Sequence, residues 1–479
     1  MQPTSHAFKA NVREALVDTT LQRALDNMRT GFPAKRLLAI SRLPEFDALR
    51  DQGRAIKNHT LENLDFYLET FERNVSRAGG HVHWARTPEE ARQIVLDICR
   101  SVDAKTVTKG KSMISEEIEL NEFLEHQGLV PVETDLGEYI IQLRHEAPSH
   151  IIAPAIHLVK EQVEEAFRAS HTDLPPDRPL SEPRELTDEA RAVLRRRFHE
   201  ADVGITGANF LIAETGSTVI VTNEGNGDLT QTLPKVHLVL ASLEKVVPTL
   251  EDATTILRLL ARSATGQEFS SYTTFSTGPR RPGDLDGPEQ FHVVLLDNGR
   301  SGMLGTEFQD MLRCIRCSAC INHCPVYSSV GGHAYGWVYP GPMGSVLTPS
   351  LIGVEEAGNL PNASTFCGKC ESVCPMRIPL PKMMRHWRER EFERNLSPAP
   401  FRWGLKLWAY FAKRPKLYRL GANLAARTLG RMGRDSGRFS RLPLAGGWTG
   451  GRDLPAPQGK SFMEQWQART EQARRREAA

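Results

Sequence analysis

Apolar residues recur at helical intervals through the first hundred positions of the chain. A helix over residues 61–75 would place four large apolar side chains on one face, those of Leu61, Leu64, Leu68 and Phe71. The paired glycines at 79–80 predict its end, and His81–Trp84 has the pattern of a short strand. Thr87 is a suitable N-cap for a second helix. We therefore predict an N-terminal helical region over residues 1–80.

From residue 81 the pattern changes to short apolar strands that alternate with helices. It predicts helices over 114–127 and 251–263, and strands over 104–108, 129–133, 149–153, 209–213, 217–222, 236–240 and 291–299. Alternation of this kind is typical of a three-layer α/β domain with a largely parallel sheet. We assign that α/β domain to residues 81–300.

The rest of the chain lacks strand patterns. Residues 331–353 are rich in Gly and Pro and predict a long loop, and such a loop inside a compact domain is usually functional. Residues 379–395 and 401–432 have helical patterns, whereas the Gly-, Pro- and Arg-rich carboxyl terminus predicts partial disorder. The expected fold class is thus α/β plus all-α. An all-α domain would cover residues 301–396, and a basic helical region with a partly disordered tail would cover 397–479.

Length and composition indicate an ordinary soluble globular protein. At 479 residues the chain exceeds the roughly 250–300 residues of a single core, so we expect more than one domain. Hydrophobic residues make up 40% and charged residues 25%. No apolar run approaches the roughly 18 residues of a membrane span, and the first residues lack the apolar core of a secretory signal. We therefore expect a cytoplasmic location.

The net charge of +2 hides a strong asymmetry along the chain. Residues 381–479 contain 22 Lys and Arg against 8 Asp and Glu, a balance of +14, whereas residues 1–380 contain 38 against 50, a balance of −12. An acidic body with a basic tail is informative about partners rather than about fold. Aromatic residues among the basic ones suit an amphipathic helix lying on a membrane surface, with Trp403, Trp408, Tyr410 and Phe411 in this segment. The alternative is a helix packed on the neighbouring domain with its basic face in solvent.

All but one of the eight cysteines lie between residues 314 and 375. The first run has the spacing C-x2-C-x2-C-x3-C-P, formed by Cys314, Cys317, Cys320, Cys324 and Pro325. This is the spacing of bacterial two-cluster ferredoxins, in which three cysteines hold one [4Fe–4S] cluster and the fourth ligates the other. Zinc sites pair two distant C-x2-C units and do not use this pattern. The eighth cysteine, Cys99, has no cysteine neighbour and is expected to be a buried thiol.

The second run is one ligand short. It comprises Cys367, Cys370 and Cys374, and Ser364 stands where a full motif would have its first cysteine. The crossed scheme assigns the first [4Fe–4S] cluster to Cys314, Cys317, Cys320 and Cys374. It leaves the second cluster to Cys324, Cys367 and Cys370, with Ser364 as the candidate fourth position. Three thiolates support a [3Fe–4S] cluster, or a [4Fe–4S] cluster whose fourth iron binds Ser364, water or a partner's ligand, and the sequence leaves both open.

Other polar groups lie near the predicted ends of strands. Gly110-Lys111-Ser112 opens a helix after a strand, but Lys105 stands where a phosphate loop requires glycine. Backbone N–H groups there, with Lys109 and Lys111, form a candidate anion site, and a solvated turn is the alternative. Several other polar residues are candidates for a binding cleft at the carboxyl ends of strands, and for each of them an ordinary structural role is the alternative. They are His150, His157, Glu133, Asp135, Glu224 and Arg280-Arg281.

Taken together, these features resemble the lactate-utilisation iron–sulfur protein family (LutB, also called LldF). The resemblance covers nearly the full length of the chain. It rests on both cysteine runs in order and on segments Lys109–Met113, Glu116–Ile118, Glu133–Gly137, Asn223–Gly227, Gly332–Gly336 and Tyr339–Pro342. The family's own second run also has three cysteines preceded by serine, so the missing ligand is in keeping with the family.

The resemblance implies a LUD domain, with a fold like that of the CoA-transferase and ribose-isomerase group. An α-helical ferredoxin domain with two iron–sulfur clusters and a family-specific carboxyl-terminal segment would follow it. The resemblance also implies a cytoplasmic complex with a cysteine-rich redox subunit and a second LUD-domain protein, which together oxidise L-lactate to pyruvate. An electron acceptor at the membrane, and association with its inner face, are further expectations, and no nucleic-acid partner is expected.

The residues alone predict a two-cluster electron carrier fused to an α/β domain, and they leave other functions open. Gly225 and Gly227 lack the third glycine of a dinucleotide fingerprint. One alternative keeps the clusters and takes glycolate, glycerol phosphate or a thiol pair as the electron donor. Another is a CoA or acyl transferase with Glu224 as nucleophile and structural clusters. A nucleic-acid-binding protein that uses the basic tail is a third.

Overall fold

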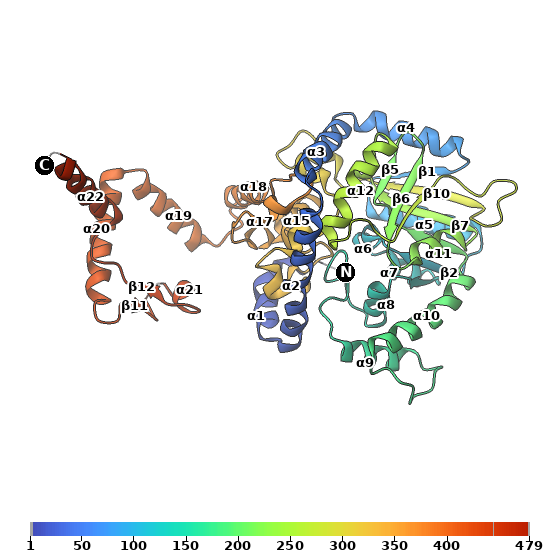
Figure 1. The fold of residues 1–479 in the computed structure, drawn as a ribbon, viewed down its shortest axis with the longest axis horizontal. Coiled ribbons are helices and arrows are strands. Elements are labelled where there is room, and N and C mark those ends of the chain that lie inside the picture. Colours follow the sequence, from blue (N-terminus) through green and yellow to red (C-terminus); the bar gives the residue numbers. More distant parts are fainter. Residues whose placement is uncertain (1–2, 444, 478–479) are drawn as a thin grey trace. The chain divides into compact units, whose positions relative to one another are not determined.

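A computed structural model describes residues 3–443 and 445–477 of the protein. Contacts between residues divide the chain into two units, Met1–Glu391 and Phe392–Ala479 (Figure 1). The first unit contains every cysteine and all the longer strands. No helix within the described residues is long and apolar enough to cross a membrane.

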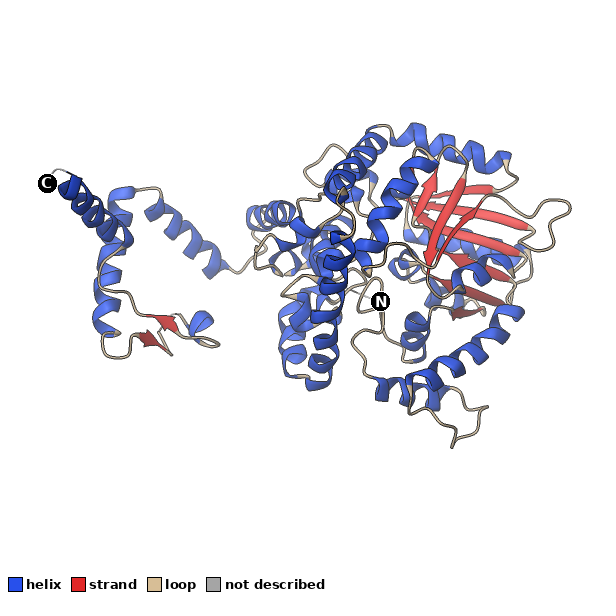
Figure 2. Cartoon of the chain, in the orientation of Figure 1, coloured by secondary structure: helices blue, strands red, loops and turns tan. Residues whose placement is uncertain are grey.

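A six-stranded parallel sheet lies at the centre of the first unit (Figure 2). Its strand order is β1-β10-β7-β4-β2-β3, with β1 His81–Ala85, β2 Thr106–Gly110, β3 Val130–Glu133, β4 Val203–Thr206, β7 Val236–Ser242 and β10 Gln290–Leu296. The chain runs from β2 outward to β3 and then returns as β4 on the other side of β2. The direction of winding therefore reverses between β2 and β4, the point at which open α/β sheets usually bind ligands.

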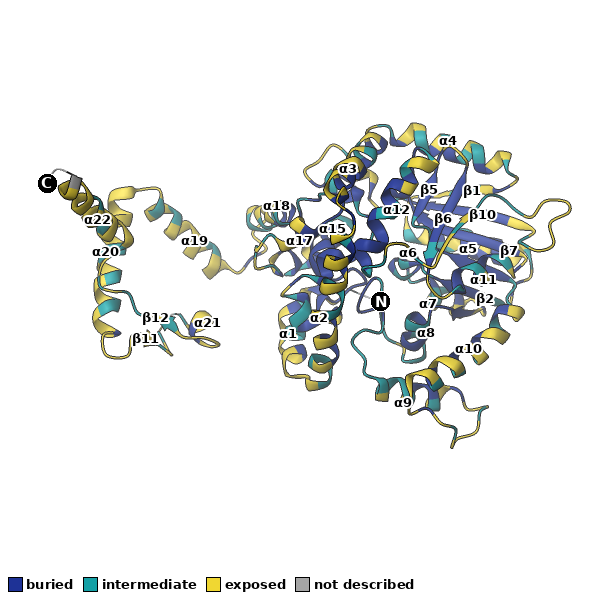
Figure 3. Ribbon diagram, viewed as in Figure 1, coloured by how far each residue is buried: buried dark blue, intermediate teal, exposed yellow. Residues whose placement is uncertain are grey.

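Side chains of the central strands alternate between two apolar layers. Leu238 and Leu240 pack on one face against three helices, α5 (Pro88–Ser101), α6 (Met113–Glu117) and α7 (Leu120–His126). Val239 and Ala241 pack on the other face against α4 (Leu64–Arg77) and two short strands, β5 (Phe210–Ile212) and β8 (Val246–Val247). This two-residue alternation is that of a strand buried on both sides. The strands in the interior of the sheet are accordingly buried (Figure 3).

A smaller mixed sheet and further helices complete the α/β part. The second sheet has the order β8-β5-β6-β9, with β6 Ser217–Thr222 and β9 Tyr272–Ser276. Around the β3 edge of the main sheet pack α8 (Leu136–Leu143), α9 (Lys160–Ser170) and α10 (Pro183–Glu200). Helix α11 (Asn226–Thr232) contacts β4, and α12 (Leu250–Ala264) packs with the amino-terminal helices.

The amino-terminal helices pack on the cysteine-bearing segment. Helices α1 (Phe8–Val17), α2 (Thr19–Ser41) and α3 (Phe46–Glu62), preceded by the 3-10 turn η1 (Ser5–Ala7), share one apolar core with that segment. Asp18 caps α2 by accepting N–H bonds from Thr20 and Leu21. The predicted helix 61–75 is divided at Asn63 between α3 and α4, although its four apolar residues are all buried.

The cysteine-bearing segment consists of short helices, so the expected class, α/β plus all-α, is confirmed. It contains η3 (Ser301–Met303), η4 (Gln309–Arg313), α13 (Ala319–Asn322), α14 (Tyr327–Val330), η5 (His333–Tyr335), α15 (Gly341–Ile352), α16 (Val354–Ala357), η6 (Leu360–Asn362), α17 (Lys369–Val373) and α18 (Leu380–Glu393). Residues 331–353, predicted as a long loop, are largely the buried helix α15. The close packing at the start of this helix requires glycine at position 344, because a Cβ there would lie 1.6 Å from the Tyr339 carbonyl oxygen.

Two further predictions of secondary structure are wrong. Residues 149–153 form turns instead of a strand, because His150 Nδ1 accepts the N–H groups of Ile152 and Ala153 at 3.2 Å each. These local bonds occupy the groups that a sheet would use. The single helix 114–127 is broken into α6 and α7, where Glu119 adopts a left-handed φ of 54°.

The second unit is composed mainly of exposed helices. It contains α19 (Ala399–Ala412), α20 (Pro415–Met432), β11 (Arg438–Phe439), α21 (Gly446–Thr449), β12 (Leu454–Pro455) and α22 (Phe462–Glu477). Neither α19 nor α20 has a buried residue, and both are exposed along their length in Figure 3. Among the described residues of the predicted partly disordered tail, 462–477 form helix α22.

Candidate functional site

The four cysteines predicted for the first cluster lie around one cavity. Mostly apolar side chains complete its wall, and the four thiols that line it are those of Cys314, Cys317, Cys320 and Cys374. Three of them are buried and Cys314 is half-buried. Cys314 directly follows η4, Cys320 lies in α13, and Cys374 ends α17. The contact between α13 and α17 thus joins the two runs of the sequence.

The two cysteine loops have matching backbone conformations. Arg316 and Ser318, on either side of Cys317, have φ values of 57° and 58°. Phe366 and Gly368, on either side of Cys367, have φ values of 54° and 76°. When the two loops are aligned at Cys317 and Cys367, Ser364 occupies the position that Cys314 has in the first loop. The Ser364 hydroxyl oxygen accepts the Phe366 N–H at 3.1 Å.

The three cysteines predicted for the second cluster differ in exposure. Cys324 and Cys370 are buried, whereas Cys367 is exposed. Burial raises the pKa of Cys324 and of Cys370, and charge on Cys367 raises both further, as charge on Cys324 does for Cys370. The structure therefore brings these three residues together, and Ser364 is half-buried in the same loop as Cys367.

The cysteine surroundings fit iron–sulfur clusters. Burial raises the pKa of Cys370 to about 12 and that of Cys374 to about 11, so these thiols ionise only when a metal replaces the proton. The Tyr327 N–H donates to Cys324 Sγ at 3.5 Å and the Ile378 N–H to Cys374 Sγ at 3.4 Å, and such bonds tune cluster thiolates. No three His, Cys, Asp or Glu side chains in the described part of the chain converge on a single ion.

Buried arginines from the amino-terminal helices hold the Cys374 loop. Arg50 Nη2 donates to the carbonyl oxygens of Cys374 at 2.7 Å and Ser372 at 2.8 Å. Arg36 Nη2 donates to the Val373 carbonyl at 2.8 Å. These guanidinium groups bring positive charge close to the first set of cysteines. The sequence pattern did not reveal them, because they lie more than 300 positions from their partners.

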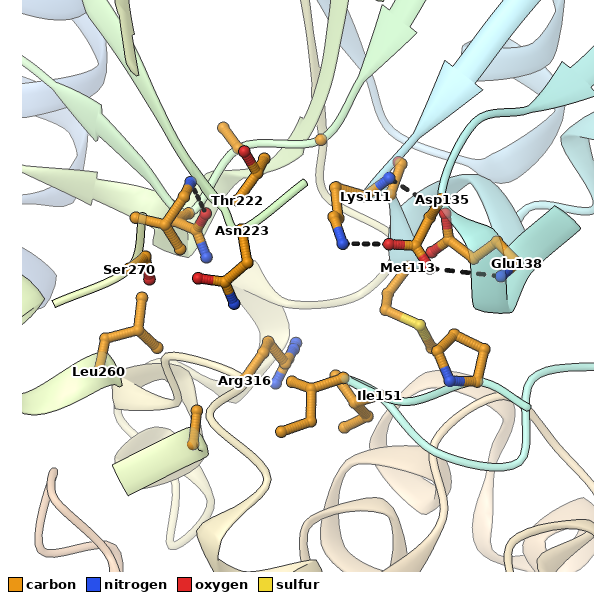
Figure 4. Close-up of a pocket in the computed structure, with 18 of the residues that line it drawn as sticks. Lys111, Met113, Asp135, Glu138, Ile151, Thr222, Asn223, Leu260, Ser270 and Arg316 are labelled. Atoms are coloured by element: carbon orange, nitrogen blue, oxygen red, sulfur yellow. Dashed lines mark hydrogen bonds and ion pairs between the residues drawn. The ribbon is translucent and has the colours of Figure 1, made fainter. Parts of the chain in front are cut away.

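A second cavity, of about 200 Å³, opens at the carboxyl ends of the parallel strands (Figure 4). Lys111 and Ser112 follow β2, Asp135 follows β3, and residues 207–209 follow β4. Gly207 permits β2 and β4 to approach here, because a Cβ would lie 2.4 Å from the Lys111 carbonyl oxygen. This ligand-sized cavity, the strand-end pocket, therefore lies at the winding reversal between β2 and β4.

The candidate anion site of the sequence lies in this pocket, but its lysine is paired. Lys111 Nζ forms ion pairs with Asp135 and, at 3.2 Å, with Glu224. Burial alone would lower the pKa of Lys111, but these carboxylates outweigh it and raise the pKa above its usual value. Lys109 is buried behind it and pairs with Glu133 at 2.6 Å. Lys111, Asp135 and Glu224 are thus brought together, whereas Glu133 lies with Lys109.

Glu138 is a pocket residue that the sequence did not reveal. Its Oε2 accepts the Lys111 N–H at 3.1 Å, and burial, together with neighbouring carboxylates, raises its pKa well above the usual value. The sequence signal was weak, since Asp135 alone marks this turn as the N-cap of α8, accepting the Gly137 N–H at 3.0 Å.

The predicted histidines and Arg280 bond to neighbouring protein groups, as expected for residues with an ordinary structural role. Burial lowers the pKa of His150 to about 4, and its Nε2 lies 2.9 Å from Asn322 Oδ1. His157 Nε2 lies 2.8 Å from Glu146 Oε2. Arg280 pairs with Glu289 at 2.9 Å on an exposed loop away from the pocket lining. Cys99 is buried, as the sequence predicts.

The two cavities share part of one wall. Arg316, which lies between Cys314 and Cys317 in the sequence, lines both cavities, and Ile151 does the same. In Figure 4 these two side chains lie on the side of the pocket opposite Lys111 and Asn223. Arg316 Nη2 bonds to Glu244 Oε1 at 3.2 Å, and its guanidinium stacks 5.2 Å from the centre of the Tyr339 ring. The strand-end pocket and the first cysteine set are therefore direct neighbours.

Comparison with known families covers nearly the whole chain. A LUD domain model matches residues 68–296, a 4Fe-4S dicluster domain model matches residues 310–378, and a model described as lactate utilisation protein B, C-terminal, matches residues 395–471. The second match agrees with the cysteine geometry and assigns iron–sulfur clusters to this segment. Its limits enclose all seven clustered cysteines.

Full-length relatives carry one name. The chain is 43% identical over 469 residues to "Lactate utilization protein B" of Bacillus licheniformis, covering 97% of each chain. It is 44% identical over 467 residues to the protein of that name from Geobacillus kaustophilus, covering 96% of this chain and 97% of that one. A crystal structure of a DUF162 family protein from Deinococcus radiodurans is 15% identical and covers 49% of this chain and 98% of that one, with a TM-score of 0.25. The full-length identities establish that this chain belongs to the lactate utilization protein B family.

Proposed function

We propose that the chain is the iron–sulfur electron-transfer subunit of a cytoplasmic complex that oxidises L-lactate to pyruvate. Membership of the lactate utilization protein B family and the 4Fe-4S dicluster match support a role in lactate utilisation. The observation that carries the electron-transfer role is the wall shared by the strand-end pocket and the first cysteine set. A small molecule in that pocket would lie beside Arg316, which stands between Cys314 and Cys317 in the sequence.

The protein's own residues would define an inner and an outer site. The inner site would be held by Cys314, Cys317, Cys320 and Cys374, and the outer site by Cys324, Cys367 and Cys370, with Ser364 as the candidate fourth position. Clusters bound there would supply one-electron transfer, and lactate oxidation releases two electrons. Apolar side chains around the inner thiols exclude water, and the exposed Cys367 brings the outer site to the surface.

The surface position of Cys367 supports a partner that receives electrons. The family resemblance points to a cysteine-rich redox subunit and a second LUD-domain protein as partners. An acceptor at the inner face of the membrane is consistent with the basic helices α19 and α20, neither of which has a buried residue.

The proposal is tested by growth and by reconstitution. In a strain without another lactate oxidase, deletion of the gene should abolish growth on L-lactate, and the wild-type gene but not a Cys320→Ala variant should restore it. In the reconstituted anaerobic complex, L-lactate should reduce the clusters faster than glycolate, glycerol phosphate or a dithiol. Unimpaired growth of the deletion strain, or faster reduction by one of the other donors, would overturn the assignment to lactate.

A further inference from the structure

The strand-end pocket contains a buried positive charge that has no partner among the described residues. Lys245 follows β7 in the short 3-10 turn η2 (Leu243–Lys245), lines the pocket and is only 8% exposed. Its ammonium forms no hydrogen bond or ion pair with any described residue. Burial, reinforced by Arg316, lowers the pKa of Lys245 to about 8. A desolvated charge without a partner is costly, and native sites keep one when a ligand supplies the opposite charge.

The charged groups around Lys245 are paired among themselves. Arg316 bonds to Glu244, and Arg300 bonds to Glu117 at 2.6 Å and to Glu244 at 3.3 Å. On the far side of the pocket, Lys111 is paired with Asp135 and Glu224. Among the described residues that line the pocket, Lys245 is therefore the cation without a counter-charge at hydrogen-bonding distance, which suits a ligand that carries negative charge.

Pocket size and position restrict the ligand further. The cavity of about 200 Å³ is smaller than the roughly 300–1,000 Å³ of sites for drug-sized molecules. Part of its wall is apolar and includes Met113, Ile151 and Leu260, whereas Arg316, Asn223 and Lys111 supply polar groups (Figure 4). A short organic acid would place its carboxylate near Lys245 and Arg316 and its alkyl group against the apolar wall. Arginine is well suited to this contact because its guanidinium matches a carboxylate.

We propose that the strand-end pocket binds a small monocarboxylic acid of the 2-hydroxy or 2-oxo class, with Lys245 as the residue that holds its carboxylate. The class of acid rests on the proposed function, whereas the negative charge of the ligand and the role of Lys245 rest on the pocket itself. Arg316 would contact the same carboxylate from the loop between Cys314 and Cys317. Occupation of the pocket would then change the surroundings of the inner cysteine site.

A second explanation for Lys245 makes a different prediction. In this explanation the ammonium, whose pKa is lowered by burial and raised in part by charge on Cys314, only balances negative charge at the inner site and no ligand binds. In that case, substitution would change the redox behaviour of the inner site, but no acid would bind in a manner that depends on Lys245. Ligand titration separates the two explanations.

The decisive variant is Lys245→Met in the full-length, anaerobically purified protein. Methionine has a similar length and removes an unpaired buried charge, so the midpoint of thermal unfolding should be unchanged or higher. Isothermal titration with L-lactate and with pyruvate should show binding to the wild type and at least a tenfold weaker affinity in the variant. The uncharged analogue lactamide should not bind the wild type measurably.

Lys57→Met is the matched control. Lys57 is also buried beside Glu244, but its ammonium donates to the backbone carbonyls of Glu244 and Val246 and it does not line the pocket. This variant should bind L-lactate within about threefold of the wild type. L-lactate should also alter the electron paramagnetic resonance (EPR) signal of the inner site in the wild type and in Lys57→Met, but not in Lys245→Met.

The outcomes distinguish this inference from the proposed function. Equal acid binding by wild type and Lys245→Met, or equal binding of lactamide and lactate, overturns the inference. Binding that depends on Lys245, in a protein whose clusters L-lactate never reduces in the assembled complex, overturns the electron-transfer role and leaves the binding site intact. If L-lactate reduces the clusters but its binding does not depend on Lys245, the inference is overturned and the electron-transfer role is kept.

Discussion

The inner and outer cysteine sites have the same loop geometry but very different surroundings. Left-handed residues flank Cys317 in one loop and Cys367 in the other. The inner site is closed in by apolar side chains and held by Arg36 and Arg50, and it adjoins the strand-end pocket. The outer site has an exposed cysteine and a serine at its candidate fourth position. The loop conformation therefore sets the positions of the thiols. The packing around each loop determines whether the site is next to a small-molecule pocket or open to a partner protein.

Burial, charge and hydrogen bonding are the properties through which a protein tunes an iron–sulfur site. All three differ between the two sites of this chain. An enclosed site beside a pocket suits electron uptake from a small molecule, and a site that reaches the surface suits delivery to another protein. Each prediction below changes one of the sites and uses the other as its reference.

The largest difference is expected when a ligand is removed from each site. Cys320→Ala should remove the inner cluster and destabilise the protein by on the order of 4 kcal/mol, because metal binding there is coupled to core packing. Cys367→Ala should lower the iron content of the outer site, with a stability loss of about 1 kcal/mol or less, because Cys367 is exposed. Iron content and thermal unfolding measure the two effects. Equal losses of stability would show that burial does not separate the sites.

The next largest effect concerns the serine of the outer site. Ser364→Cys supplies the thiolate that Cys314 supplies in the inner loop, so the outer site should hold a [4Fe–4S] cluster in this variant. Reduced protein should then show two interacting [4Fe–4S] signals by EPR, and oxidised protein should show no sharp [3Fe–4S] signal. The same two EPR signals identify the type of outer cluster in the wild-type protein.

The control for this variant is Ser364→Ala. It should leave the inner-site signal unchanged and should weaken the outer cluster only if the serine oxygen is a ligand. A Ser364→Cys protein that retains an oxidised-state [3Fe–4S] signal would contradict the register between the loops.

The sequence predicts those features of the two sites that depend on residues close together in the chain. Cysteine spacing leads to the grouping in which Cys374 lies with Cys314, because ligand spacing is a local property of the chain. Strand and helix alternation predicts the α/β class for the same reason. Which clusters the cysteines hold stays a prediction.

Long-range packing explains what the sequence does not predict. Arg50 reaches Cys374 from a helix 324 positions away, and Lys245 lines the pocket through the turn after β7. Neither residue belongs to a motif. Residues 149–153 were predicted as a strand because they are apolar, but the His150 side chain binds their backbone and turns the chain. Side chains that bond to distant or neighbouring backbone groups leave no periodic pattern.

Chemical modification compares the sites after iron is removed by a chelator. Hydrogen bonding from the Lys369 N–H, with a further contribution from Thr365, lowers the pKa of Cys367, whereas burial raises the pKa of Cys320 well above its usual value. Cys367 should therefore contain more thiolate at neutral pH and react with iodoacetamide at least about tenfold faster than Cys320. Mass spectrometry of timed samples gives both rates. Similar rates would show that the inner cavity opens when iron is lost.

The smallest expected effect is on reduction potential. Arg50→Gln removes a positive charge whose guanidinium lies 2.7 Å from the Cys374 carbonyl oxygen, so the inner site should become harder to reduce. We expect its potential to fall by about 30–60 mV, up to a tenfold change in the equilibrium, whereas Lys369→Gln should shift the outer site by less than about 15 mV because solvent screens an exposed charge. Arg50→Lys keeps the charge and should retain most of the potential. Redox titration followed by EPR resolves the two signals, and an equal fall at both sites in Arg50→Gln would mean that the arginine acts through the fold as a whole.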